Sequence, residues 1–175
     1  MSSGEDLGLP AALSEAHERG FDYDGGDGVD FEPYEHFMTA AETVDWWRSW
    51  TGDASATRAP FRVFGQDGTG GVAAFWMVRP DAPLEHQPVV FLGSEGETGV
   101  VAGDLASYLW LLADGFGPWE ATAYPEHEHT PRRDARLTGV AERHAASARR
   151  SAAEIIAAGR AEFPDFEDLI QAQCR

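Results

Sequence analysis

The pattern of apolar residues between positions 61 and 92 is typical of neighbouring β-strands. Residues 61–64 (FRVF) and 72–78 (VAAFWMV) are two apolar runs separated by the turn-rich sequence GQDGTGG. Because glycine and aspartate favour the tight turns that join antiparallel strands, this arrangement predicts a hairpin. Residues 88–92 (PVVFL) form another short apolar run, which starts at a proline as a strand tolerates, and they predict a third strand.

The second strand of this hairpin is apolar on both faces. One face carries Val72, Ala74, Trp76 and Val78, and the other carries Ala73, Phe75 and Met77. A strand of this kind is covered on both sides, so we expect it at the centre of the sheet.

An amphipathic helix that lies on the sheet is predicted next. Its apolar residues recur at helical spacing: Leu105, Tyr108, Leu109 and Leu112. Asp104 lies at its start, where a carboxylate is favourable, and Gly115 follows its end, where glycine often terminates a helix.

The residues before position 39 carry weaker signals. Residues 7–19 are weakly helical, and residues 21–30 (FDYDGGDGVD) form an acidic segment rich in turn residues. Residues 29–38 alternate apolar residues with acids, which predicts an edge strand that tolerates Pro33.

Thr39 and Glu42 have the spacing of a capping box, which predicts a helix that continues to about Trp50. Trp46 and Trp50 lie one turn apart on one face, and Trp47 is displaced from them by about 100°. At least one indole should therefore lie near the surface. Tryptophan is usually a core residue, but it is also enriched at binding hot spots, so Trp47 is a candidate anchor for a partner.

The C-terminal part predicts a linker followed by helices. Residues 118–131 (PWEATAYPEHEHTP) lack periodicity and predict a surface linker. Residues 137–161 are rich in alanine with alternating glutamate and arginine, which predicts one solvated helix. Pro164 breaks this helix, and Asp165 is expected to cap a last short one. The apolar face of that last helix consists of Phe166, Leu169 and Ile170.

These elements predict a single α+β domain. We expect a mainly antiparallel sheet with a central hairpin, covered by helices, and a helical C-terminal extension. Residues 1–118 would form the core, residues 119–136 a surface linker, and residues 137–175 helices that pack on the core. A chain of 175 residues, 43% of them hydrophobic, is long enough for one such domain.

The order of these features resembles the SUKH superfamily over residues 31–117. The shared features are a glycine and aspartate turn, a strand with bulky apolar residues at its end, a PVV strand, an acidic glycine turn at residues 94–99 and an apolar helix. The turn residues are Gly65, Asp67, Gly68 and Gly70. This superfamily includes fungal cell-wall regulators of the Smi/Knr type and many bacterial immunity proteins, which neutralise toxins by binding them. The resemblance implies a protein-binding domain without catalytic residues.

The chain departs from the family pattern at both ends. The family's leading helix, with its Leu-Pro-Tyr punctuation, is echoed only by Leu9 and Pro10, and the tail after Pro118 is longer than the core pattern requires. Because of these departures, the resemblance does not extend to the order of the N-terminal strands or to the role of the last helices, whereas it includes the central hairpin and its helix.

The charge of the chain is strongly negative and unevenly distributed. The net charge is −17, and all 13 basic residues are arginine. Residues 1–131 hold 23 acids and 5 arginines, hence −18, whereas residues 132–175 hold 7 acids and 8 arginines, hence +1. Because an acidic protein repels nucleic acid and anionic membranes, we expect neither as a partner.

The segment from Glu5 to Glu35 is the preferred electrostatic footprint, since it holds ten acidic residues and one arginine. Toxins that attack nucleic acid tend to be basic at their working surface, so an acidic protein would be steered toward them. A general acidic bias that favours solubility explains the same charge equally well. The candidate protein-binding residues are Asp22, Asp24, Asp27, Asp30, Glu32, Glu35, Trp47 and Asp67.

Calcium-loop and phosphate-loop motifs do not fit. A calcium loop that starts at Asp22 would need a ligand at Gly26, a glycine at Asp27 and a glutamate at Pro33. A P-loop needs a lysine, which the chain lacks.

His127 and His129 are the strongest chemical candidates. On an extended chain they point the same way, and Glu126 or His144 could add a third ligand for a divalent metal in a hydrolase. Such motifs usually lie on a rigid strand or helix, whereas these histidines lie between two prolines, which favours adventitious surface histidines. No nucleophile motif occurs, so we expect no enzyme and no cofactor.

The leading hypothesis is an immunity-type protein that neutralises a basic, nucleic-acid-targeting toxin by stoichiometric binding. The alternatives are a regulatory scaffold that binds a cellular enzyme and the metal-dependent hydrolase. The single cysteine, Cys174, suits a reducing compartment, and the N-terminus has neither the basic nor the apolar region of a secretion signal. We therefore expect a cytoplasmic protein.

Overall fold

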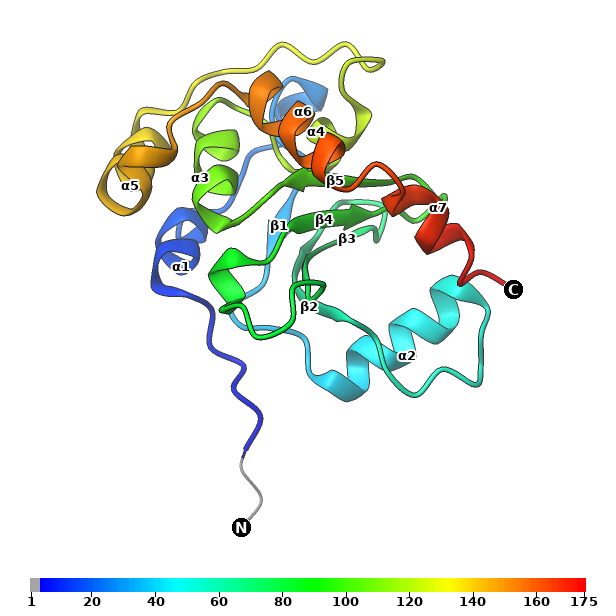
Figure 1. Cartoon of the computed structure of the whole chain (residues 1–175). Coiled ribbons are helices and arrows are strands. Elements are labelled where there is room, and N and C mark those ends of the chain that lie inside the picture. The colour runs from blue at the N-terminus through cyan, green and yellow to red at the C-terminus, as the bar shows by residue number, and fades with distance from the viewer. Residues whose placement is uncertain (1–3) are drawn as a thin grey trace.

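A five-stranded antiparallel sheet forms the middle of the protein (Figure 1). The computed structural model describes residues 4–175. Across the sheet the strands follow the order of the chain, and each is antiparallel to the next. They are β1 (Glu32–Pro33), β2 (Phe61–Gln66), β3 (Val72–Trp76), β4 (Val89–Leu92) and β5 (Thr98–Ala102). The prediction of an α+β fold with a mainly antiparallel sheet is confirmed.

Strands β2 and β3 form the predicted hairpin. Phe61 lies opposite Trp76, Gln66 lies opposite Val72, and the pairing is irregular just before Gly65. A Cβ atom at Gly65 would lie 2.3 Å from the Phe31 ring. Glycine at this position therefore lets the ring pack directly on the β2 backbone.

Strand β3 is buried on both faces, as predicted for a central strand. It contributes to two separate core clusters, Val72, Ala74 and Trp76 to one and Ala73 and Phe75 to the other. The strand ends at Trp76, and Met77, which was expected on a buried face, is 40% exposed. That expectation is wrong for Met77, which lies just beyond the last residue of β3, although its N–H still donates to the Pro60 carbonyl at 2.8 Å in register with the hairpin.

Helices cover both faces of the sheet. One face is covered by α1 (Ala11–His17), α3 (Leu105–Ala113), α4 (Pro118–Ala123) and α6 (Ala152–Glu162), and α5 (Ala135–Ala145) packs on α3 and α1 farther from the sheet. The other face packs against α2 (Ala40–Thr51) and α7 (Phe166–Gln171). Figure 1 shows α2 and α7 close together near the C-terminus. There the Arg175 N–H donates to the Thr51 carbonyl at 2.8 Å, which ties the last residue to the end of α2.

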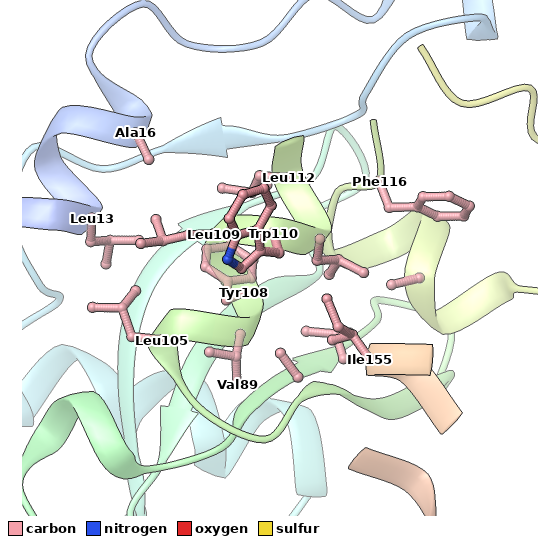
Figure 2. Close-up of a cluster of buried hydrophobic side chains, with 14 of the residues drawn as sticks. Leu13, Ala16, Val89, Leu105, Tyr108, Leu109, Trp110, Leu112, Phe116 and Ile155 are labelled. Atoms are coloured by element: carbon pink, nitrogen blue, oxygen red, sulfur yellow. The ribbon is translucent and has the colours of Figure 1, made fainter. Parts of the chain in front are cut away.

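Helix α3 is buried on almost all sides, so the prediction of an amphipathic helix is wrong. Asp104 caps the helix as expected, since its carboxylate accepts from the Ser107 N–H at 2.8 Å. Eight of its nine residues are buried, however, because α1, α5 and α6 cover what the sheet leaves open. Figure 2 shows Leu13 of α1 and Ile155 of α6 beside α3. Within residues 4–175 no helix combines the length and the hydropathy that a membrane crossing requires.

The sequence pattern did not reveal β5. Its apolar run is short, and Gly99 near its start is a residue type depleted in strands. The structure accounts for Gly99, because a Cβ atom at this position would lie 3.2 Å from the side chain of Thr122 in α4. The small residue lets α4 approach the sheet.

The alanine-rich region forms two helices where one was predicted. Helix α5 ends at Ala145, and α6 begins after Ser151, which forms a capping box with Glu154. Asp165 stands at the start of α7, but its side chain makes no capping hydrogen bond. Leu169, expected on the apolar face of α7, is 53% exposed, whereas Phe166 and Ile170 of the same helix are buried.

The first part of the predicted surface linker is a helix that packs into the core. Helix α4 begins at Pro118, a favourable first helical position for proline. Glu120 and Ala121 within it are only 3% and 0% exposed. Only the stretch from 125 to 134 has the irregular, mostly exposed character that was expected.

Candidate functional site

The central part of the acidic footprint predicted from Glu5 to Glu35 is a compact loop between α1 and β1. The Asp22 carboxylate accepts from the Asp24 N–H at 2.9 Å, and the Asp22 carbonyl accepts from the Val29 N–H at 2.9 Å. A Cβ atom at Gly28 would lie 1.9 Å from that carbonyl oxygen, so the loop closes only with glycine there. We define the acidic surface as the exposed carboxylates of this region, Glu18, Asp22, Asp24, Asp27, Glu32 and Glu35.

Two open hollows flank this loop. The first, called the Arg132 hollow, has a volume of about 560 Å³ and is lined among others by Asp22, Asp24, Asp27, Arg132 and Asp134. The second, called the β1 hollow, has a volume of about 620 Å³ and is lined among others by Glu18, Phe21, Phe31, Glu32, Tyr34 and Glu35. The structure thus brings five of the predicted binding residues to two neighbouring concave surfaces.

Arg132 lies against the aspartates that line the Arg132 hollow. Its guanidinium donates to the Asp24 carboxylate at 2.7 Å and lies 3.9 Å from the Asp27 carboxylate. The hydrogen bond to Asp24 and the surrounding aspartates raise the pKa of Arg132. Two of the predicted binding carboxylates therefore already have a cationic partner within the chain.

Asp30 has a structural role. Its carboxylate accepts from the Gly68 N–H at 2.8 Å, and its own N–H donates to Glu120 Oε1 at 2.6 Å. Asp30 therefore links the acidic loop to the hairpin turn and to α4. Glu120 was not anticipated as a site residue, because its segment was expected to be a linker. The proline at the first position of α4 was the available signal for a helix there.

Asp67 is also a structural residue and does not belong to the surface. It is 1% exposed, and its Oδ1 accepts from the N–H and the hydroxyl of Thr69 and from the Gly71 N–H at 3.0, 2.8 and 2.8 Å. These bonds hold the turn between β2 and β3. The prediction that Asp67 binds a partner is wrong for the folded state, because a macromolecule cannot reach the carboxylate.

Trp47 is likewise unavailable as a surface anchor. It is 5% exposed and stacks on Trp50, with ring centroids 5.8 Å apart and planes 7° from parallel. Trp50 and Trp46 are half-buried, and the Trp50 indole N–H donates to the Gly93 carbonyl at 2.8 Å. The expectation of an indole near the surface fits these two residues, whereas Trp47 faces the sheet.

His17 is a buried residue that the sequence did not single out. It is 6% exposed, and its ring lies among those of Phe21, Phe31, Phe64 and Tyr108. Burial and the nearby charge of Arg136 lower its pKa to about 3, so the imidazole is neutral at physiological pH. Its Nε2 lies 3.5 Å from the Tyr108 hydroxyl, and its Nδ1 has no hydrogen-bond partner within residues 4–175.

The candidate metal ligands do not converge. His144 Nε2 lies 2.6 Å from the Glu15 carboxylate, which also pairs with Arg143, and these contacts join α5 to α1. His129 Nε2 lies 2.8 Å from the Gly115 carbonyl, and the ring of His127 packs on Trp119. In the described part of the chain no three histidine, cysteine or acidic side chains are arranged to hold a metal ion.

Comparison with protein-family models, with curated proteins and with solved structures found no match for the chain. The relationship to the SUKH superfamily therefore remains a prediction from the sequence motifs.

Proposed function

We propose that this protein is a non-catalytic binding domain that captures a basic protein partner on its acidic surface, in the manner of the SUKH immunity proteins. The observation that carries the proposal is the concentration of exposed carboxylates around two open hollows that flank the loop between α1 and β1. The other candidate binding residues, Asp30, Asp67 and Trp47, support the fold. The partner we propose is a basic toxin that acts on nucleic acid.

The electrostatics favour this class of partner. A protein with a net charge of −17 attracts a cationic surface over distances comparable to the Debye length, about 8–10 Å at physiological salt. A nucleic-acid-binding surface is cationic because it must neutralise phosphates. Carboxylates held on a compact loop can occupy such a surface and exclude the nucleic acid from it.

The experiment is a pull-down with the tagged full-length chain from its own cells. The bound proteins are eluted at about 50 mM and then at about 500 mM NaCl and identified by mass spectrometry. We expect a basic protein that is retained at low salt and released at high salt. Loss of toxicity when the two proteins are co-expressed would identify the partner as a toxin, whereas a non-toxic enzyme would indicate a regulatory scaffold.

A charge-matched pair of variants makes this experiment specific. The triple variant Glu18→Gln, Asp27→Asn, Glu35→Gln removes three charges from the acidic surface. The control Glu85→Gln, Glu167→Gln, Asp168→Asn removes three exposed charges elsewhere. Weaker capture by the first variant alone supports the proposal, and equal weakening by both shows that only net charge matters and contradicts a defined binding surface.

A further inference from the structure

The two hollows beside the acidic loop differ in whether their carboxylates are already paired. In the Arg132 hollow, the guanidinium of Arg132 lies against Asp24 and Asp27. In the β1 hollow, Glu18, Glu32 and Glu35 form no ion pair with any residue between 4 and 175. In one acidic hollow two carboxylates are therefore paired with an arginine, and in the other none of the three carboxylates is paired within residues 4–175.

The floor of the β1 hollow suits a flat cation. Phe21, Phe31 and Tyr34 line it together with Leu9 and Pro33. The face of an aromatic ring attracts a cation, and the attraction is stronger where water is excluded. Tyr34 is held in place by its hydroxyl, which donates to Gln66 at 2.9 Å, and Gln66 in turn donates to Glu32 at 3.1 Å.

The charge of the lining is negative. Three carboxylates and one arginine, Arg19, give a formal charge of −2, and His17 adds no charge because its imidazole is neutral at physiological pH. Arg19 has no ion-pair partner in the described chain and also lines the other hollow, so it can turn toward the aspartates there.

One residue that lines the β1 hollow carries a buried polar atom without a hydrogen-bond partner in the described chain. His17 lines the hollow and is 6% exposed, and its Nδ1 has no partner among residues 4–175. A buried polar group without a hydrogen bond destabilises the folded state, because it loses its bonds to water without replacement. In the tautomer that carries its proton on Nε2, this nitrogen would accept a hydrogen bond from a donor that reached it.

We propose that the β1 hollow receives one arginine side chain of the partner, a proposal that rests on the proposed function and names its central contact. The guanidinium would stack on the aromatic floor and donate to Glu18, Glu32 or Glu35 at the rim. Arginine suits this site better than lysine because its planar fork combines ring stacking with paired hydrogen bonds to carboxylates. The volume of about 620 Å³ also leaves room for the residues that flank the arginine.

The direct test uses three short peptides that differ at one position. The full-length, isotope-labelled chain is titrated with acetyl-Gly-Arg-Gly-amide and with the lysine and citrulline versions, and amide chemical shifts are followed by NMR. We expect the arginine peptide to shift the amides of Phe21, Phe31 and Tyr34, with an affinity several-fold higher than that of lysine and no binding of neutral citrulline. Equal binding of arginine and lysine, or shifts confined to the Arg132 hollow, would overturn the proposal.

Variants separate the β1 hollow from general charge. Glu18 and Glu35 are exposed and make no side-chain hydrogen bond within residues 4–175, so Glu18→Gln with Glu35→Gln should fold normally. We expect this double variant to lose about fivefold or more in affinity for the arginine peptide, the size of one or two surface ion pairs. The matched control Asp22→Asn with Asp27→Asn should change it less, and an equal loss would overturn the assignment to the β1 hollow.

The failure of this inference is distinguishable from the failure of the proposed function. If the pull-down yields a basic partner that binds the acidic surface, but the peptides show no preference for arginine, the proposed function stands and the arginine site is wrong. If the arginine peptide binds the β1 hollow but no basic protein is captured, the site stands and the proposed partner class is wrong.

Discussion

The N–H of Asp30 donates to Glu120 Oε1 at 2.6 Å, across 90 positions of the chain. This bond joins the end of the acidic loop to α4, and the second carboxylate oxygen of Glu120 is buried with no partner among the described residues. Burial is the main reason that the pKa of Glu120 is raised above its ordinary value. The acidic surface is therefore anchored to the core through a carboxyl group that the fold prefers in its neutral form.

The variant Glu120→Gln tests this arrangement. A raised carboxyl pKa contributes stability that is fully present at low pH and is lost as the pH rises through the folded-state pKa. Glutamine keeps an acceptor for Asp30 and has no charge to bury. We expect the free energy of unfolding of the variant, relative to the natural protein, to increase as the pH rises above about 4.5, measured by urea denaturation.

The exposed neighbour Glu126 provides the control for that experiment. Glu126→Gln should leave the pH dependence unchanged. If Glu120→Gln and the natural protein lose stability in parallel from acid to neutral pH, then Glu120 is not the group responsible.

His17 should give the opposite pH dependence. Its pKa is lowered to about 3, so the unfolded chain binds a proton below about pH 6.5 that the folded chain does not. The neutral, buried His17 therefore contributes to the free energy of unfolding above about pH 6.5, and this contribution is lost as the pH falls toward 3. Between about pH 7.5 and pH 4.5 the loss amounts to roughly 2–3 kcal/mol. In urea denaturation, His17→Phe should lack this loss, whereas the exposed His86→Gln should retain it.

Removing Trp47 should affect stability and leave partner binding intact. Trp47→Ala removes a side chain that stacks on Trp50 and packs beneath the sheet, which typically costs about 3–5 kcal/mol. The half-buried Trp46→Ala should cost less. Thermal unfolding measures the cost, and binding to the arginine peptide is measured below the unfolding temperature. If Trp47→Ala remains stable but no longer binds the arginine peptide, Trp47 is part of the binding surface and the prediction is wrong.

Arg132→Gln should make the acidic surface more attractive to cations. The Arg132 side chain is 62% exposed, so solvent screens its ion pair with Asp24 and the pair contributes little to stability. Its removal frees Asp24 and Asp27. Calorimetry with a hexa-arginine peptide at low salt should show tighter binding, with little change in the urea midpoint. Weaker or unchanged binding would mean that the Arg132 hollow takes no part in attracting a cationic partner.

The elements that were predicted correctly carry their signals locally. The hairpin follows from the turn sequence between two apolar runs, and α2 begins where the Thr39 and Glu42 capping box indicated. The same signal was present at Ser151 and Glu154, where α6 starts, but the alanine-rich sequence around it masked the break. Helix α4 and strand β5 were missed because both are short and depend on contact with each other.

The site residues show a different limit. Asp24, Asp30 and Asp67 are the same residue type in equally polar, glycine-rich sequence, yet one is exposed, one supports the loop and one is buried. Long-range contacts decide among these roles, and no local pattern encodes them. His17 illustrates the same point, because its burial depends on Phe31, Phe64 and Tyr108, which come from the loop before β1, from β2 and from α3.

The outer edge of the sheet has a consequence for self-association. Strand β1 has only two residues, one of them a proline without an N–H, and the following segment covers the rest of β2 irregularly. The N–H groups of Tyr34 and Met38 donate to the Phe64 and Val63 carbonyls at 2.9 and 3.0 Å. This arrangement gives a second copy no continuous row of free backbone groups on β2. The fold thereby blocks aggregation by edge-to-edge strand pairing at this edge, even where salt screens the repulsion between like charges.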